Sequence, residues 1–367
     1  MMRQWRRGLG VVAAAGVVTA AVCVVGVVGS APAGAQGPCL SVDGIQVLGS
    51  PIDCDSDAVN GSLAVAASAL SSKAFAGAEN NSRAAASALN GSNARATTGA
   101  GSNNSAVAAA VNGSDALAQV LAGSNNTAQA SGAAVGSATA VVDGNGSAAD
   151  SIADHGSNAR SNAVEGDDNT ARAFADNGSS ADAAATDGDR NVAIARADHG
   201  GNANAFAFDG SDNVGMAGAD EGGFSSATAG DEGSNNLALS NAVGAGSTAN
   251  AATANGNDNV AVAASTSNSN AIAGAGGENS TAGAVATGGA LARATAVNGG
   301  AAGAGAVLGG QANAVGDDFN ALAVAAGPGS AANADGTTPT CTGNLSAAAQ
   351  TSDGAFCVNF FGLNVNG

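Results

Sequence analysis

The sequence predicts an all-β fold, a two-turn β-solenoid of about 22 residues per coil, with a core of Ala, Gly and Ser and a disulfide-stapled cap at each end. Here "two-turn" means two chain reversals in each coil. Three features lead to this prediction: a repeat of about 22 residues, small residues at every second position, and basic residues on the opposite parity. Such a period is typical of solenoids, in which each repeat buries its core only against its neighbours.

The repeat is clearest in three consecutive blocks, which begin at His155, Asn177 and His199. Each block has glycine at its second and twelfth positions, and Ala, Ser or Gly at nearly every odd position between them. The glycines therefore divide each coil into two intervals of similar length, which indicates two turns per coil. Both intervals are even, so the side-chain parity of a β-strand is kept through each turn.

Residues 1–35 are expected to be a secretory signal peptide. MMRQWRR supplies three arginines, an apolar stretch runs from Gly8 to Gly29, and Ala33 and Ala35 fit the small-x-small rule for cleavage before Gln36. The apolar stretch is also long enough to span a bilayer, so an uncleaved membrane anchor is the alternative. The protein is therefore expected to be secreted or associated with the cell envelope.

The two ends of the remaining chain are expected to be caps. Residues 36–59 and residues 336–367 hold larger apolar residues and two cysteines each. A rod keeps its ends tens of ångströms apart, whereas the Cα atoms of a disulfide lie within about 7 Å of each other. We therefore expect two local disulfides, Cys39–Cys54 and Cys341–Cys357. A zinc site is not expected, because the chain has no CxxC motif.

Residues 60–335 are expected to form the solenoid repeat domain, with about twelve coils. Basic residues test the parity, because an arginine in an alanine core would carry a large desolvation cost. Seven of the eight fall on the even parity, opposite to the alanines, and Arg293 is the exception: Lys73, Arg83, Arg95, Arg160, Arg172, Arg190 and Arg196. The odd positions are therefore expected to point inward. The register breaks around residues 236–244, where two extra residues place Leu237 and Leu239 on the inward parity.

Helix and disorder are the competing interpretations of this composition. Alanine has the highest helix propensity, but its spacing here is 2 rather than 3.6, and a turn signal recurs about every eleven residues. Acidic, glycine-rich chains with few aromatic residues often fail to fold. The register kept over four successive blocks favours the solenoid over disorder.

The charge of the chain limits its partners. All 29 acidic residues and all but three of the 11 basic residues follow the signal peptide, so the mature chain would carry a net charge of about −21. A charge of this sign repels nucleic acid, which is therefore not an expected partner.

Acidic turns are the candidate metal sites. Residues one coil apart stack in a solenoid, so carboxylates can form a ladder that calcium bridges through oxygen ligands. The candidate ligands are Asp167, Asp168, Asp189, Asp209 and Asp212. Because the GGxGxDxUx motif of calcium-loaded β-rolls is absent and Arg190 interrupts the column, solvated turn residues are the alternative.

No catalytic site is expected. His155 and His199 lie two coils apart, about 10 Å, which is too far for a shared metal or a catalytic pair. The chain has no nucleophile elbow, phosphate loop or zinc motif. The sequence therefore predicts a non-enzymatic protein, with no cofactor other than the calcium of the alternative above.

The outward positions hold two sets of larger apolar residues. Val192, Ile194, Val214 and Met216 are expected to stack on one side of adjacent coils, and Phe206 and Phe208 are expected to lie on the other side. Exposed apolar stripes on a solenoid indicate a surface for a partner or for self-association, and scattered surface residues are the alternative.

The alternating alanines and Gly-Asn turns resemble the β-roll heads of trimeric autotransporter adhesins. The period differs, and the coiled-coil stalk and membrane-anchor barrel of those proteins are not expected here. The whole chain is more similar to uncharacterised secreted Ala/Gly/Asn-rich proteins of actinobacteria, a resemblance that implies no known activity. The sequence thus predicts an exported structural or surface-interaction protein, with a calcium-stabilised acidic β-roll or an adhesin-like binding rod as alternatives. It does not identify the partner, whether a second copy or a cell-surface molecule.

Overall fold

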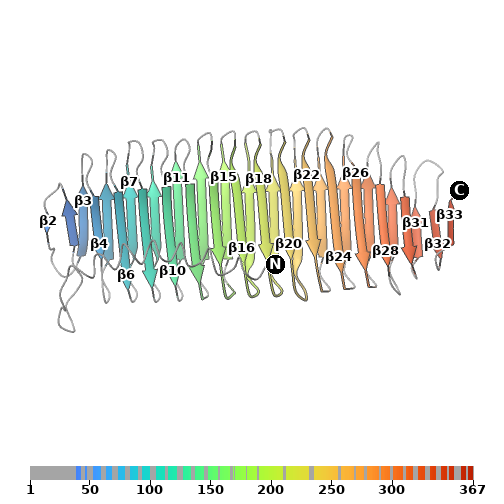
Figure 1. Ribbon diagram of the computed structural model, residues 1–367, viewed down its shortest axis with the longest axis horizontal. Coiled ribbons are helices and arrows are strands. Elements are labelled where there is room, and N and C mark those ends of the chain that lie inside the picture. Colours follow the sequence, from blue (N-terminus) through green and yellow to red (C-terminus); the bar gives the residue numbers. More distant parts are fainter. Residues whose placement is uncertain are drawn as a thin grey trace, which may run out of the picture.

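The chain forms a rod of stacked β-strands. The computed structural model describes residues between 39 and 366, with gaps that fall in the connections between strands, and side chains between 75 and 335, again with gaps. Every helix or strand in these ranges is a β-strand, and the strands belong to two long sheets and one short hairpin. Figure 1 shows the strands following one another in chain order along the long axis. The residues of the expected signal peptide lie outside the described ranges.

Sheet A contains 16 strands and sheet B contains 15. In spatial order, sheet A consists of β2 (Gln46–Val47), β1 (Cys39–Val42), β4 (Leu63–Ala67), β6 (Arg83–Leu89), β8 (Ser105–Val111), β10 (Thr127–Ala133), β12 (Ala148–Asp154), β14 (Thr170–Ala175), β16 (Val192–Ala197), β18 (Val214–Ala219), β20 (Leu237–Ala242), β22 (Val260–Ser265), β24 (Thr281–Thr287), β26 (Ala301–Val307), β28 (Ala321–Ala326) and β30 (Thr340–Asn344).

Sheet B runs alongside it and supplies the other strand of each coil. Its strands are β3 (Asp53–Ala58), β5 (Lys73–Ala78), β7 (Ala94–Thr98), β9 (Ala116–Val120), β11 (Ser137–Asp143), β13 (Asn158–Val164), β15 (Ser180–Thr186), β17 (Asn202–Ala207), β19 (Phe224–Ala229), β21 (Thr248–Thr253), β23 (Asn270–Ala275), β25 (Leu291–Ala296), β27 (Gln311–Gly316), β29 (Ala331–Asp335) and β31 (Ala347–Gln350). The hairpin consists of β32 (Cys357–Phe360) and β33 (Leu363–Asn366).

The parallel β-solenoid is confirmed, and the number of its coils is larger than expected. Each strand pairs in parallel with the strand one coil away, for example Thr170 with Val192 and Val192 with Val214. Counted as turns of the whole solenoid, the rod has not two but about nine coils of about 22 residues between Arg83 and Thr281. Shorter coils continue both sheets beyond these nine, so the ladder also exceeds the expected twelve coils. At about 4.8 Å per coil, sheet B is about 70 Å long.

Alanine builds the core, because inward positions alternate with outward ones along every strand. In β16, Ala193, Ala195 and Ala197 are at most 1% exposed. The two sheets lie close together at this core. A Cβ atom added to the inward Gly215 would lie 2.6 Å from the backbone oxygen of Thr228 on the other sheet. A core of this thickness has room for methyl groups and little more.

Serines occupy some inward positions and bond across the core. Ser161 Oγ of sheet B donates to Ser151 Oγ of sheet A over 2.8 Å. Ser240 Oγ of sheet A donates to the backbone oxygen of Ser225 in sheet B, also over 2.8 Å. A buried hydroxyl without a partner is costly, and the close approach of the sheets supplies one.

The parity argument from the basic residues is confirmed where side chains are described. All seven described arginines are exposed, and Arg293 is among them. The side chain of Lys73 lies outside the described ranges. Counting alternate positions along the chain places Arg293 inward, because the coils around it are shorter than the common repeat and the count shifts.

The inward assignment of Leu237 and Leu239 was wrong. Both leucines are on the outward face of β20, and Ala238, Ser240 and Ala242 are buried. The coil from Val214 to Leu237 is one residue longer than the coil before it, and the extra residue lies in the connection before β20 rather than in the strand. The connection absorbs the shift, so the strand keeps its small inward face and no bulge is needed.

The ends of the rod carry the expected cysteines, but their pairing is not described. Cys39, Cys54, Cys341 and Cys357 lie in β1, β3, β30 and β32, and their side chains fall outside the described ranges, so both disulfides stay predictions. The parallel ladders begin at Asp53 and reach Gln350, so they extend past residues 60 and 335 at both ends. β1 runs antiparallel to β4 and follows a different pattern from the coils.

Candidate functional site

Each coil has two edges, and the edge after the sheet A strands carries a repeated Ala-Asp-x-Gly sequence. The aspartates recur once per coil, and the residue after each has a positive φ of 53° to 57°. We name the eight residues of these four coils the turn row: Asp154, His155, Asp176, Asn177, Asp198, His199, Asp220 and Glu221. Glycine follows each pair, and the three of these glycines that the structure describes have φ of 79° to 97°. Two successive left-handed residues turn the chain sharply, and this favours glycine at the second.

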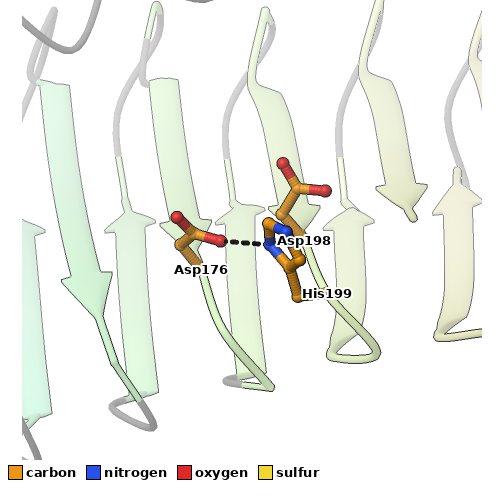
Figure 2. A group of neighbouring side chains, drawn as sticks. All are labelled: Asp176, Asp198 and His199. Carbon is orange, nitrogen blue, oxygen red and sulfur yellow. Dashed lines mark hydrogen bonds and ion pairs between the residues drawn. The ribbon is translucent and has the colours of Figure 1, made fainter. Parts of the chain in front are cut away.

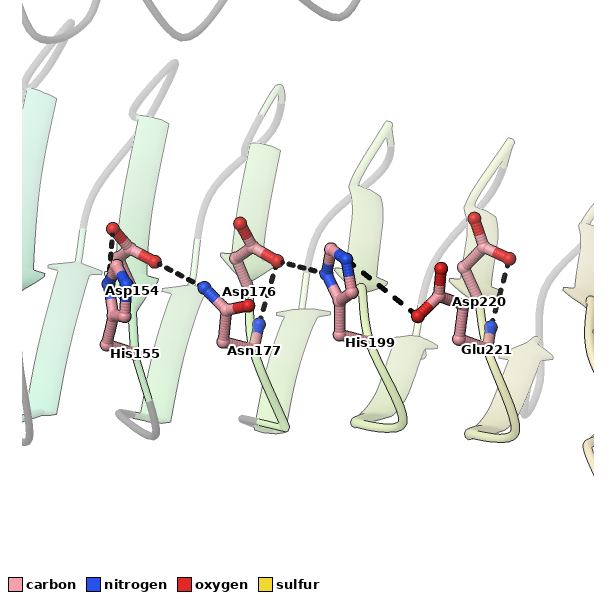
Figure 3. Close-up of polar contacts among 7 residues, drawn as sticks. All are labelled: Asp154, His155, Asp176, Asn177, His199, Asp220 and Glu221. Atoms are coloured by element: carbon pink, nitrogen blue, oxygen red, sulfur yellow. Dashed lines mark hydrogen bonds and ion pairs between the residues drawn. The ribbon is translucent and has the colours of Figure 1, made fainter.

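The turn row is linked from coil to coil (Figure 3). Asn177 Nδ2 donates to Asp154 Oδ1 of the previous coil over 3.2 Å, and the Nδ1 of His199 lies 2.8 Å from Asp176 Oδ1. His199 Nε2 also lies 3.8 Å from Glu221 Oε2 of the next coil. Asn177 and His199 therefore each lie beside the aspartate carboxylate of the coil before. This geometry follows from stacking at about 4.8 Å, since one side chain spans that distance.

His199 has the most acidic surroundings in the turn row. The hydrogen bond with Asp176, followed by the negative charge of Glu221, raises the pKa of the His199 imidazole above its ordinary value. Asp176, Asp198 and His199 each offer a ligand atom, and these atoms lie within 4.8 Å of one another (Figure 2). Every described contact of the imidazole ring is with a carboxylate. The arrangement can therefore hold a proton or a cation.

The expected calcium ligands lie at the other edge of the coils, after the sheet B strands. Asp168, Asp209 and Asp212 are exposed there, and Asp167 and Asp189 lie outside the described residues. Asp212 Oδ2 is 3.5 Å from Arg190 Nε of the previous coil. Arg190 neutralises part of the negative charge of these stacked aspartates. Calcium binding at this edge stays a prediction.

Buried asparagines line the same edge as these aspartates. Asn191, Asn213, Asn236 and Asn259 are fully buried, and each amide oxygen after the first accepts a hydrogen bond from the backbone N–H of the asparagine one coil earlier, over 2.8 to 2.9 Å. Asn191 and Asn213 therefore stack on each other at this turn. The ladder ties successive coils together at a position where the backbone leaves the sheet.

The aliphatic residues expected on one outer face do lie together. Val192 pairs with Val214, and Ile194 pairs with Met216, in adjacent strands of sheet A. The pairing continues through the next two strands, with the side chains partly exposed. We name this set the aliphatic face: Val192, Val214, Leu237 and Val260 in one row, and Ile194, Met216, Leu239 and Val262 in the next. The leucines were missed from the sequence because their parity depends on the length of the preceding connection.

Phe206 and Phe208 belong to a separate surface. Phe206 lies on the outward face of β17 in sheet B, and Phe208 follows the end of that strand. Their rings stack with centroids 5.7 Å apart and planes 20° apart. The expected separation from the aliphatic face is therefore correct, and the two rings partner each other.

The turn row was missed as a unit by the sequence reasoning. The sequence separates His155 from His199 by two coils, and the contacts join each of them to an aspartate. The recurrence of Ala-Asp-x-Gly once per coil is the signal that identifies it.

No helix in the described part of the chain is long and apolar enough to cross a membrane.

Comparison with known proteins adds no relative: no protein-family model matches the chain, and no curated protein or solved structure matches it significantly.

Proposed function

We propose that this chain is a non-enzymatic, exported structural or surface-interaction protein that presents its outer faces and edges along a rigid rod. The observation that carries the proposal is the contrast between the inside and the outside of the coils. Inward positions are almost uniformly Ala, Gly, Ser or Thr in the described strands, whereas outward positions change from coil to coil. A rod whose variation is confined to its surface is suited to making contacts along its length.

Export is tested by following the full chain in a bacterial host that secretes proteins. We expect the mature protein in the medium or the cell envelope, with Gln36 as its first residue, as read by N-terminal sequencing. A chain retained in the cytoplasm with residues 1–35 intact would contradict the proposal. Replacing Ala33 and Ala35 with bulky residues should leave the precursor uncleaved, which serves as the control for the cleavage site.

A calcium-stabilised acidic β-roll is the alternative function. Its test is thermal melting of the mature protein with calcium and with a chelator. A rise in the melting temperature with calcium that is lost in Asp168→Asn and Asp209→Asn would support it. Equal melting temperatures in calcium and chelator would exclude it.

A further inference from the structure

The outer face of sheet A has no charged side chain over six strands. From β18 to β28, the described outward residues are Val214, Met216, Gly218, Leu237, Leu239, Asn241, Val260, Val262, Ala264, Thr281, Gly283, Val285, Thr287, Ala301, Gly303, Gly305, Val307, Leu322, Val324 and Ala326. Several of these are well exposed, with Val285 at 49% and Leu322 at 44%. A contiguous exposed apolar surface of this kind marks an interaction site.

Sheet B of the same coils is different. Its outward positions include Asn250, Asn270, Arg293, Asn313 and Asp335. Both sheets share one core and one repeat length, so the solenoid itself does not require an apolar outer face. The absence of charged side chains is therefore specific to the outer face of sheet A and does not follow from the repeat.

Large side chains are followed by glycines along the rows of this face. In the row of Leu239 and Val262, the next two strands place Gly283 and Gly303. A Cβ atom added to Gly303 would have no atom within 4 Å. The row is therefore a ridge over β18 to β22 and a recess over β24 and β26.

We propose that a second copy of this chain packs on this face, with the two rods antiparallel about a two-fold axis between β22 and β24. The axis lies in the interface and runs along the strands. It places Val262 of one copy over Gly283 of the other, and Leu239 over Gly303. Val262 and Leu239 of each copy thus fill the recess of the other, which is the self-complementarity that a two-fold interface requires. At the end of the same row, Met216 of one copy meets Leu322 of the other.

The neighbouring row fits the same axis. It places Ala264 over Val285, Asn241 over Gly305 and Gly218 over Val324, because these residues occupy one row in successive strands. In each of these three pairs, alanine or glycine meets a larger residue. Two sheets with such alternation interdigitate closely, as dry β interfaces do.

The size and charge of the face agree with a dimer. Six strands at about 4.8 Å, with at least three outward residues each at about 6.8 Å, cover roughly 600 Å² before side-chain relief is counted. This is close to the roughly 800 Å² per partner of a stable interface. The chain is acidic, with a formal charge of −18. The nearest charged residue described on the outer face of sheet A is Arg196 on β16, which borders the six strands beside Gly218, and Asp150 and Arg172, on β12 and β14, lie farther away. Two apolar faces therefore meet without like charges opposite each other.

The test is the mass of the mature chain in solution, by sedimentation and by light scattering. We expect twice the mass of one chain, and a single-chain mass for Leu239→Asp and for Gly303→Leu. Gly303→Leu adds only apolar atoms and has open space in one copy, so a loss of dimer there reports a filled recess rather than added charge or misfolding. Ile272→Asp is the matched control on sheet B, where Ile272 is 39% exposed, and it should leave the dimer intact.

The axis itself is tested by a cross-link. Leu239→Cys combined with Gly303→Cys should give a disulfide between chains, detected by the mass of the linked peptide. Within one chain the two positions are three strands apart, about 14 Å, too far for a disulfide. A mature chain of single mass would overturn the proposal, as would a dimer that survives both face variants or lacks the cross-link. A monomer that floats with phosphatidylcholine vesicles would overturn it in favour of a lipid surface.

This inference rests on the proposed function, in which the outer faces make contacts. The experiments distinguish a failure of the dimer from a failure of the exported role. An exported but monomeric chain removes the dimer and leaves the exported rod. A dimer found only with its signal peptide intact in the cytoplasm removes the exported role and leaves the dimer.

Discussion

At the scale of single residues, the volume of the side chain decides which positions this rod accepts. The two sheets approach so closely at Gly215 that one added carbon atom would contact the backbone of Thr228. On the other face of the same strand, Gly218 has open space around the place of its missing Cβ. Two glycines three residues apart therefore have opposite tolerance for a methyl group.

Gly215→Ala should destabilise the protein. Gly274→Ala should not, because Gly274 on the outward face of β23 in sheet B also has open space and lies outside the proposed dimer face. Overpacking of a tight core costs about 1 to 3 kcal/mol, whereas a surface change of this size stays within about 0.5 kcal/mol. The denaturant midpoint of each variant, followed by circular dichroism, measures both effects. Equal midpoints for the two variants would show that the sheets are farther apart than the structure has them.

His199 gives the rod a pH-dependent contact. Its folded pKa is raised by Asp176 and Glu221, so protonation stabilises the folded state. This stabilisation is fully present below the pKa of the unfolded imidazole, about 6.5, and is lost as the pH rises through the higher folded pKa. The ring lies among the carboxylates of Asp176, Asp198 and Glu221.

His199→Asn should remove this dependence between pH 6 and pH 9. Asparagine is the matched replacement, because Asn177 occupies the same position one coil earlier and bonds to Asp154. We expect the melting temperature of the wild type, measured relative to the variant, to be higher at pH 6 than at pH 9. A difference between the two proteins that is the same at both pH values would contradict a stabilising proton on His199.

At the scale of the elements, the connections set the faces of the strands. The coil into β20 has an odd number of residues, yet its leucines stay outward, because the extra residue is taken up before the strand begins. The repeat pattern was sufficient to predict strands, two sheets and the inward alanines. It failed at Leu237 and Arg293, because parity counted along the chain cannot show in which connection a residue has been gained or lost.

The contacts between coils were harder to predict than the strands. Asn191 and Asn213 could be placed at a turn from their spacing, and their stacking followed. The pairing of His199 with Asp176 occurs with a left-handed backbone at His199, a conformation that few residues other than glycine adopt. The sequence signals this conformation only through the following glycine. Candidate sites at turns therefore require the geometry of the connection.

Asn213→Ala should destabilise the rod by about 1 to 3 kcal/mol. The substitution removes the acceptor of the Asn191 N–H and leaves a buried donor without its partner. It also removes the donor to the backbone oxygen of Phe208. Asn202→Ala, at an exposed position of β17, is the matched control and should leave the denaturant midpoint unchanged. If both variants unfold at the wild-type midpoint, the asparagine ladder adds no stability.

At the scale of the whole molecule, the coil is the unit in which the rod can be shortened. Every parallel ladder joins a strand to the equivalent strand one coil away, and the asparagine contacts recur from coil to coil between Asn191 and Asn259. Stability in such a molecule is a sum over coils and over the interfaces between neighbours. Length and fold are therefore separable properties.

Deleting residues 192–213, one complete coil, should leave a folded rod. The deletion joins Asn191 to Val214 and keeps every inward position inward, so the β spectrum and a cooperative melt should persist. Deleting residues 192–202, half a coil, places Asn204 and Phe206 on the inward parity of a sheet A strand. We expect that variant to lose cooperative melting. A folded half-coil variant with wild-type stability would contradict the inward and outward assignment.

The parallel pairing one coil back has a consequence for how the chain acquires its structure. Each strand that is added to a ladder pairs with a strand that was synthesised one coil earlier, and this separation does not grow with the length of the rod. A chain that emerges from a pore with its N-terminus first therefore meets a completed template at each step, and no early segment waits for a distant one. Assembly can then proceed coil by coil as the chain emerges.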